Sequence, residues 1–395
     1  MKRLYILPIL LTLSQAGCIE EYNPNLSTRL SAIVVEGLVT NLSESYTVKI
    51  SEAVPFDSAA NATGIMGAEV TIADDLGNTY LMHEDDFHGN YYSNSSEFVA
   101  VPGRSYTLQI KMPNGDLYES SAQRLTVPAI IDSVYGDIAN KEYLYTDQLG
   151  NLTTKMASGS ETFMDISNNA DSIIQFRFDN TLMKCFTYWY AYTPEMKAAE
   201  VPFPPANPCF AVACPYVMYN WQKFELNTAI NLTNRLQAVN SNTLKNNSVC
   251  FFPFDDSFYP LTYRKDTCGH DPGGHLQCIT LRTIESVDDI LQTRIYSLTE
   301  ESSVYYNEIS NQLSSEGKLF DPVAVQLQGN IKCMNNPNKL ALGFFEVSSC
   351  TTKSYRLVYD YIAGTTTYQP VADITGLAGS GSSQYIPEFW QLIFQ

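Results

Sequence analysis

The sequence predicts a mainly β protein with two domains, one over residues 30–130 and a second over residues 131–395 that contains a single prominent helix. Three observations support this. Apolar and polar residues alternate in short segments, turn residues interrupt these segments every 8 to 12 residues or so, and only one segment has clear helical spacing. The length of 395 residues also favours two domains, because single cores seldom grow beyond about 250 to 300 residues.

The first domain consists of short predicted strands. Residues 30–39 are apolar and β-branched, residues 46–50 and 68–73 alternate, and residues 104–110 and 117–121 flank Asn114-Gly115. An Asn-Gly pair is a strong hairpin signal. Because the alternation leaves no room for crossover helices, we expect an immunoglobulin-like antiparallel β-sandwich rather than a parallel sheet.

The second domain is also rich in predicted strands, at residues 174–178, 186–192, 276–283 and 355–359. The one predicted helix covers residues 299–316. Ser297 and Glu300 have the spacing of a capping box, and Gly317 can end the helix. One face carries the apolar residues Tyr305, Ile309 and Leu313. We expect this face to pack on a sheet, and the alternative is that it forms part of a groove for a partner.

The first 18 residues are typical of an export signal. Lys2 and Arg3 precede an apolar run that is too short to span a bilayer. The ending Ala16-Gly17-Cys18 resembles the lipobox of bacterial lipoproteins, which predicts a signal peptide over residues 1–17 and a lipid on Cys18. Residues 18–29 then form a polar tether. The alternative is an ordinary signal peptide cleaved near this position.

Acidic residues directly follow Cys18. Glu20 and Glu21 resemble the surface-export signal of lipoproteins from the Bacteroidota. The alternative interpretation is a solvated acidic tether. We therefore expect a protein anchored in the outer membrane by lipid and facing the cell exterior.

Eight cysteines remain when Cys18 is assigned to the lipid. An even number in an exported protein predicts disulfides, so the second domain should be stapled by them. Short loops favour three of the pairs and leave the fourth by remainder. The predicted pairs are Cys209 with Cys214, Cys268 with Cys278, Cys333 with Cys350, and Cys185 with Cys250.

The segment from Cys268 to Cys278 also contains His270 and His275, which makes it a weak candidate for a metal site. In an oxidising compartment these cysteines are more readily explained as a disulfide, since paired sulfurs cannot act as zinc ligands. The intervening Pro-Gly-Gly excludes a helical pair of histidine ligands. We therefore expect no metal or other cofactor.

Charge and motifs exclude several function classes. The chain has 42 acidic and 24 basic residues, and removing Lys2 and Arg3 with the signal changes the net charge from −18 to −20. Such a surface repels nucleic acid. The common hydrolase, P-loop and EF-hand motifs are absent. Asp255-Asp256 and the His83–His88 segment are best explained as solvated turns, so the sequence does not favour an enzyme.

Tyrosine is abundant, with 26 residues. A dense aromatic group is a possible binding surface, because rings with a polar tip suit interfaces and stacking against sugars. The alternative is an aromatic core. The group comprises Tyr188, Trp189, Tyr190 and Tyr192.

Several phrases together resemble the family of domain of unknown function 4249, lipoproteins of the Bacteroidota. They are VVEGLVTN at 34–41, GAEVTIADDLGNTYLM at 67–82, PGRSYTLQI at 102–110, PAIIDSVY at 128–135 and YSLTEESSVYYNEI at 296–309. The first domain is also similar to transthyretin-like or carboxypeptidase-regulatory sandwiches. The resemblance implies an envelope accessory protein, often encoded beside a TonB-dependent outer-membrane transporter, and no catalytic residues.

We therefore expect a non-enzymatic surface lipoprotein that docks on a TonB-dependent β-barrel transporter or another envelope protein. Two alternatives remain open. One is a glycan-binding, adhesin-like module, and the other is a secreted hydrolase that acts on surface glycans or peptides.

Overall fold

The computed structural model describes most of the chain between residues 32 and 383. The described residues are 32–54, 62–84, 88–146, 152–167, 175–192, 214–226, 230–233, 243–254, 265–270, 276–315, 327, 329–360, 362–371 and 380–383. For some strand and helix residues only the backbone is described, notably 186–192, 214–220, 265–270 and 276–288. The predicted lipidation site Cys18 and the tether lie outside the described residues.

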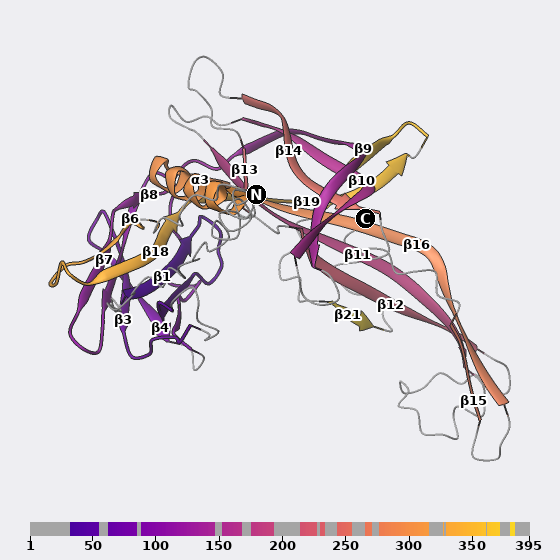
Figure 1. Ribbon diagram of the computed structural model, residues 1–395, viewed down its shortest axis with the longest axis horizontal. Coiled ribbons are helices and arrows are strands. Elements are labelled where there is room, and N and C mark those ends of the chain that lie inside the picture. Colours follow the sequence, from indigo (N-terminus) through magenta and orange to yellow (C-terminus); the bar gives the residue numbers. More distant parts are fainter. Residues whose placement is uncertain are drawn as a thin grey trace, which may run out of the picture.

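The described chain forms two sheets and one helix, which confirms the prediction of a mainly β protein (Figure 1). The first sheet has the order β17 (Ile331–Cys333), β7 (Leu117–Ser120), β6 (Ser105–Lys111), β3 (Glu69–Asp74), β4 (Thr79–Glu84), β5 (Asn90–Tyr92), β2 (Thr47–Glu52), β1 (Ala32–Val39) and β18 (Leu340–Val347), with β8 (Gln123–Arg124) beside β6.

The first sheet encloses a core of its own. Strand β4 changes partner along its length, since Met82 pairs with β3 whereas His83 pairs with β5. Alternate residues point inward as the sequence predicts; in β3, for example, Val70 and Ile72 are fully buried. Core residues come from strands at both ends of the sheet order, including Phe345 in β18. The immunoglobulin- or transthyretin-like arrangement stays a prediction.

Two strands of the first sheet come from the far end of the chain. The sequence-based division placed residues 331–347 in the second domain, but β18 pairs in parallel with β1 and β17 pairs with β7. Asn330 joins these two edges: its side chain donates to the Phe345 carbonyl and accepts from the Phe345 N–H, both at 2.9 Å. The buried Asn330 amide thereby replaces one rung of a β-ladder.

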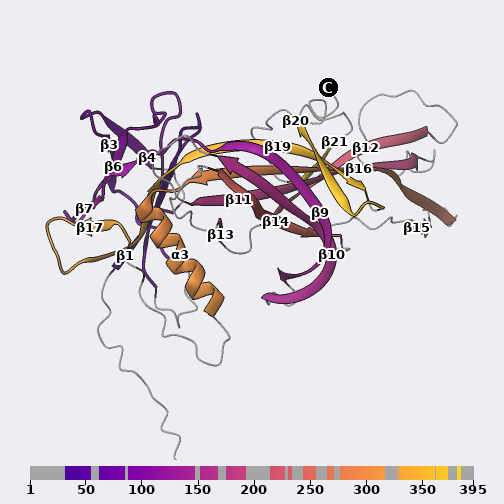
Figure 2. The ribbon, with the colours of Figure 1, turned by 90° about the horizontal axis from the view of Figure 1, so that it is seen from above.

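The second sheet has the order β14 (Thr243–Pro253), β10 (Leu152–Ser167), β9 (Ile130–Thr146), β20 (Thr365–Val371), β19 (Ser349–Asp360), β16 (Leu276–Ser297), β11 (Phe176–Tyr192), β12 (Cys214–Glu225) and β21 (Gly381–Ser383). Strand β13 (Asn231–Leu232) lies beside β11, and β15 (Lys265–His270) lies beside β16. Figure 2 shows β9 and β10 curving strongly.

This sheet curls until β14 approaches β11, although five strands separate the two in the sheet order. The Asn180 amide of β11 donates to the Val249 carbonyl of β14 at 3.1 Å. The enclosed face holds a second core that includes Phe178, Phe252 and Leu291. A buried ion pair lies in the same sheet, where Lys184 Nζ is 3.3 Å from Asp289 Oδ2.

The described cysteines are buried thiols, so two of the predicted disulfides are wrong. Cys333 belongs to the core of the first sheet and Cys350 to a small cluster between the sheets, and Cys250 lies in the second core. Cys185 is buried in β11 and is not bonded to Cys250. Buried cysteine behaves as a small apolar side chain. Cys333 and Cys350 therefore pack in different clusters, although they lie close together in the sequence. Burial raises the pKa of Cys250 to about 12 and that of Cys350 to about 11.

The predicted pairs Cys268 with Cys278 and Cys209 with Cys214 stay predictions. Cys268 and Cys278 are register partners in the backbone of β15 and β16, but their side chains are not described. Cys214 begins β12, and Cys209 lies outside the described residues. In the part of the chain that the structure describes, no helix has both the length and the apolar character required to cross a bilayer.

Asp74 organises the turn between β3 and β4. Its carboxylate accepts hydrogen bonds from the backbone N–H groups of Leu76 and Asn78, at 2.9 Å each, and from the Asn78 side chain at 2.8 Å. Arg104 lies 2.9 Å away. Burial alone would raise the pKa of Asp74, but these hydrogen bonds and Arg104 lower it to about 2.

We expect Asn330→Ala to destabilise the first sheet by about 2 to 4 kcal/mol, because the N–H and carbonyl of Phe345 lose their partners in a buried position. Denaturant unfolding would measure the change. Asn338→Ala, at an exposed position of the adjacent loop, is the matched control and should change stability little. Equal effects of the two substitutions would contradict the role of Asn330.

We expect Asp74→Asn to lower the melting temperature at neutral pH. Because the folded pKa of Asp74 lies below the ordinary 3.8, its carboxylate contributes stability above about pH 4, and this contribution is lost as the pH falls towards 2. The difference between wild type and variant should therefore narrow over that range in thermal scans. A difference that does not depend on pH would contradict the assignment.

Candidate functional site

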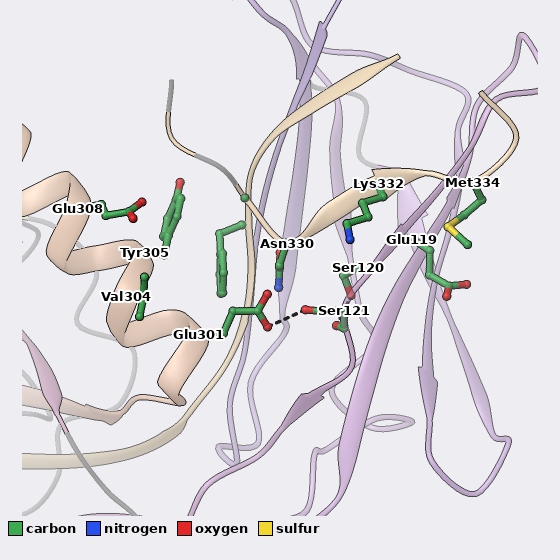
Figure 3. Close-up of a pocket in the computed structure, with 12 residues that line it drawn as sticks. Glu119, Ser120, Ser121, Glu301, Val304, Tyr305, Glu308, Asn330, Lys332 and Met334 are labelled. Atoms are coloured by element: carbon green, nitrogen blue, oxygen red, sulfur yellow. Dashed lines mark hydrogen bonds between the residues drawn. The ribbon is translucent and has the colours of Figure 1, made fainter. Parts of the chain in front are cut away.

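A groove of about 610 Å³ lies between helix α3 (Glu300–Ser315) and the outer side of the first sheet (Figure 3). We call it the α3 groove. Its lining residues are Glu119, Ser120, Ser121, Glu301, Val304, Tyr305, Glu308, Gly329, Asn330, Lys332, Met334 and Phe344. Strands β7 and β17 form one wall, and the helix forms the other.

The sheet wall follows from strand alternation. Tyr118 and Ser120 of β7 point into the protein and are buried, which leaves Glu119 on the outer face. In β17, Lys332 is exposed between buried Ile331 and Cys333. Glu119 and Lys332 are direct register partners, so the pairing of two short strands places these opposite charges side by side.

The helix wall follows from helical spacing. Thr299 caps the helix, since its hydroxyl accepts the Ser302 N–H at 3.1 Å; the predicted cap, Ser297, lies at the end of β16 instead. Positions three and four residues apart share a face, which directs Glu301, Tyr305 and Glu308 towards the groove (Figure 3).

The helix packs through a different face from the one predicted. Ser302 and Ser303 are fully buried, whereas Leu313 is 47% exposed and Tyr305 lines the groove. The Ser303 hydroxyl donates to the Gln175 side chain at 2.6 Å. Small hydroxyl residues allow the helix to approach the second sheet closely, and the apolar stripe is left partly uncovered.

A buried ion pair fixes the helix between the two sheets. Arg177 of β11 lies 3.3 Å from Glu346 of β18, and the Tyr306 hydroxyl of α3 donates to the same carboxylate. The guanidinium also lies 4.1 Å from the ring centroid of Tyr296. Burial on its own lowers the pKa of Arg177, but the Glu346 charge raises it above its ordinary value. Arg177 therefore stays charged and joins three elements.

The floor of the groove is closely packed. The rings of Tyr305 and Phe344 stack with centroids 4.7 Å apart. Gly329 passes so near to Gly343 that a Cβ at position 329 would lie 1.7 Å from the Gly343 carbonyl oxygen. Only glycine fits at this crossing, which holds the segment before β17 against β18.

The groove combines negative charge with exposed apolar surface. It has three carboxylates, Glu119, Glu301 and Glu308, against the single cation Lys332. In the part of the chain that the structure describes, none of these four side chains forms a salt bridge. Val304 and Met334 are 43% and 60% exposed. Among the described residues, no histidine or cysteine lines the groove.

Comparison with known proteins shows the family. The model for "Domain of unknown function (DUF4249)" matches residues 19–354. The chain belongs to the DUF4249 family. No curated protein matches the chain, and no solved structure matches it. The DUF4249 match includes both walls of the α3 groove.

The binding residues predicted from the DUF4249 sequence lie elsewhere. Tyr188, Trp189, Tyr190 and Tyr192 belong to β11 where it pairs with β12 and β16, but their side chains are not described. His270 ends β15 with only its backbone described, and His275 lies outside the described residues. Within the described ranges, no group of three or more His, Cys, Asp or Glu side chains could hold a metal ion.

Sequence reasoning missed the α3 groove because its walls come from distant segments. The one available signal was the open alternative for the predicted helix, that its apolar face forms part of a partner groove. Tyr305, which belongs to that predicted apolar face, does line the groove. Nothing in the sequence indicated that Glu119 would lie opposite this helix.

We expect Arg177→Met to destabilise the protein by about 3 to 5 kcal/mol, because it leaves the Glu346 carboxylate buried without its cation. The double change Arg177→Met with Glu346→Met should regain most of this loss. Lys111→Met, which breaks an exposed pair with Glu69, is the control and should cost less than about 1 kcal/mol. A double variant as unstable as Arg177→Met alone would contradict this account.

Proposed function

We propose that this DUF4249 chain is a non-enzymatic, lipid-anchored protein of the outer membrane that binds another envelope protein. In this proposal it serves as an accessory or binding subunit of a TonB-dependent transporter or a related complex. The α3 groove is the observation that carries the proposal, because it presents exposed apolar side chains and carboxylates that form no salt bridge within the described residues, on a scaffold of two sheets.

The composition of the groove supports binding to protein. Exposed apolar side chains beside charged residues are typical of interaction surfaces, and Val304 and Met334 supply that apolar surface. Cys250 and Cys350 give no support to a nucleophilic role, since burial raises their pKa values and keeps them as thiols.

The proposed anchor rests on the sequence. Cys18 follows an apolar export segment and precedes Glu20 and Glu21, as in lipoproteins directed to the cell surface. A diacylglycerol and a further acyl chain would hold the protein stably on a membrane, because each buried methylene contributes about 0.8 kcal/mol. The first described strand begins at Ala32, so the proposed tether leads directly into the first sheet.

Affinity purification of the full chain from native outer membranes tests the proposal. We expect a stoichiometric envelope partner to copurify with the wild-type chain, and Cys18→Ala to move the chain from the membrane fraction to the soluble fraction. Quantitative mass spectrometry of both fractions measures the two outcomes. A wild-type chain that is recovered as a monomer, or a Cys18→Ala chain that stays on the membrane, would contradict the proposal.

A further inference from the structure

We propose that the α3 groove binds an extended, cationic segment of a partner protein, with arginine or lysine side chains against Glu119 and Glu308 and apolar side chains against Val304 and against Met334. This inference rests on the proposed binding function and deepens it by naming the chemistry of the partner.

The charges of the groove are unbalanced. Three carboxylates and one ammonium group line it, and no salt bridge neutralises any of them within the described ranges. Glu301 is already engaged, since it accepts hydrogen bonds from Ser121 at 2.8 Å and from Gln123. Glu119 accepts only an exposed hydrogen bond from Gln109 at 3.1 Å. Glu119 and Glu308 therefore have the oxygen atoms most available to a bound cation.

The two available carboxylates lie on opposite walls. Glu119 belongs to β7 and Glu308 to α3 (Figure 3). A ligand that satisfies both must cross the groove, which suits a chain segment with more than one cationic side chain. The volume of about 610 Å³ is sufficient for several side chains but is too small for a folded domain.

The exposed apolar surface of the groove sets a second requirement for the bound segment. Val304 on the helix and Met334 at the end of the sheet wall are exposed without cover from the described chain. Methionine adapts to different apolar shapes. Leucine or aromatic side chains placed against Val304 and against Met334 would remove this surface from water. The matching partner therefore alternates cationic and apolar residues.

The walls are held in place before any ligand binds. Asn330 joins the two edges of the first sheet, and Arg177 fixes the helix to Glu346 of β18. A preformed groove loses little conformational entropy on binding. The net charge of −18 also disfavours an anionic lipid surface or nucleic acid as the occupant.

Isothermal titration of the full chain with blocked hexapeptides tests this inference. The probe alternates arginine and leucine; one matched peptide has glutamate for arginine, and another has serine for leucine. We expect only the arginine–leucine peptide to bind well, and its affinity to fall as salt rises. An equal affinity for the glutamate peptide, or binding to phosphatidylglycerol vesicles in place of the peptide, would overturn the inference.

Matched variants locate the binding. Glu119→Gln with Glu308→Gln should weaken the arginine–leucine peptide about tenfold. Glu69→Gln with Glu142→Gln removes the same charge at exposed positions outside the groove and should change affinity by less than about twofold. Equal weakening by both pairs would overturn the assignment to the groove.

The same variants separate this inference from the proposed function. If the wild-type chain copurifies with an envelope partner and Glu119→Gln with Glu308→Gln keeps that partner, the groove inference fails while the proposed function stands. If no partner copurifies but the peptide binds and the groove variant loses it, the inference stands and the proposed function fails.

Discussion

The completion of the first sheet by strands from the far end of the chain is the constraint on which the rest of the structure depends. Strands β17 and β18 pair with β7 and β1, and the Asn330 side chain bridges them. The chain leaves the second sheet after β16, forms α3, adds these two strands to the first sheet and returns as β19. The first core is therefore incomplete without this excursion, because Ile331, Cys333 and Phe345 belong to it.

This path couples the two sheets electrostatically. Arg177 and Arg294 both belong to the second sheet. Arg177 faces Glu346 of β18, and Arg294 faces Glu44 in the loop between β1 and β2. Arg294 lies 2.9 Å from Glu44 in a partly exposed position, where an ion pair contributes little. The Arg177–Glu346 pair is buried. It fixes the position of β11 relative to β18, because neither charge is tolerated in a buried position without the other.

The α3 groove is a consequence of the same path. The helix docks on the second sheet through small polar residues such as Ser303, so the side that carries Glu301, Tyr305 and Glu308 faces the strands that follow it. Strand β17 carries Lys332 outward because Ile331 and Cys333 fill the first core. Binding chemistry at this position therefore arises from residues that also build the fold.

The sequence alone determined the local elements. Period-two alternation predicted strands such as β3 and β6, and the spacing of Tyr305, Ile309 and Leu313 predicted one helix within a residue of its observed ends. These features depend on neighbours along the chain, and family membership followed from the order of such segments. Tertiary structure decided which core each strand joins, that Cys333 and Cys350 lie in separate clusters, and that Glu119 faces α3. An apolar pattern predicts that a residue will be buried but does not specify the residues it packs against, because the hydrophobic effect is non-directional.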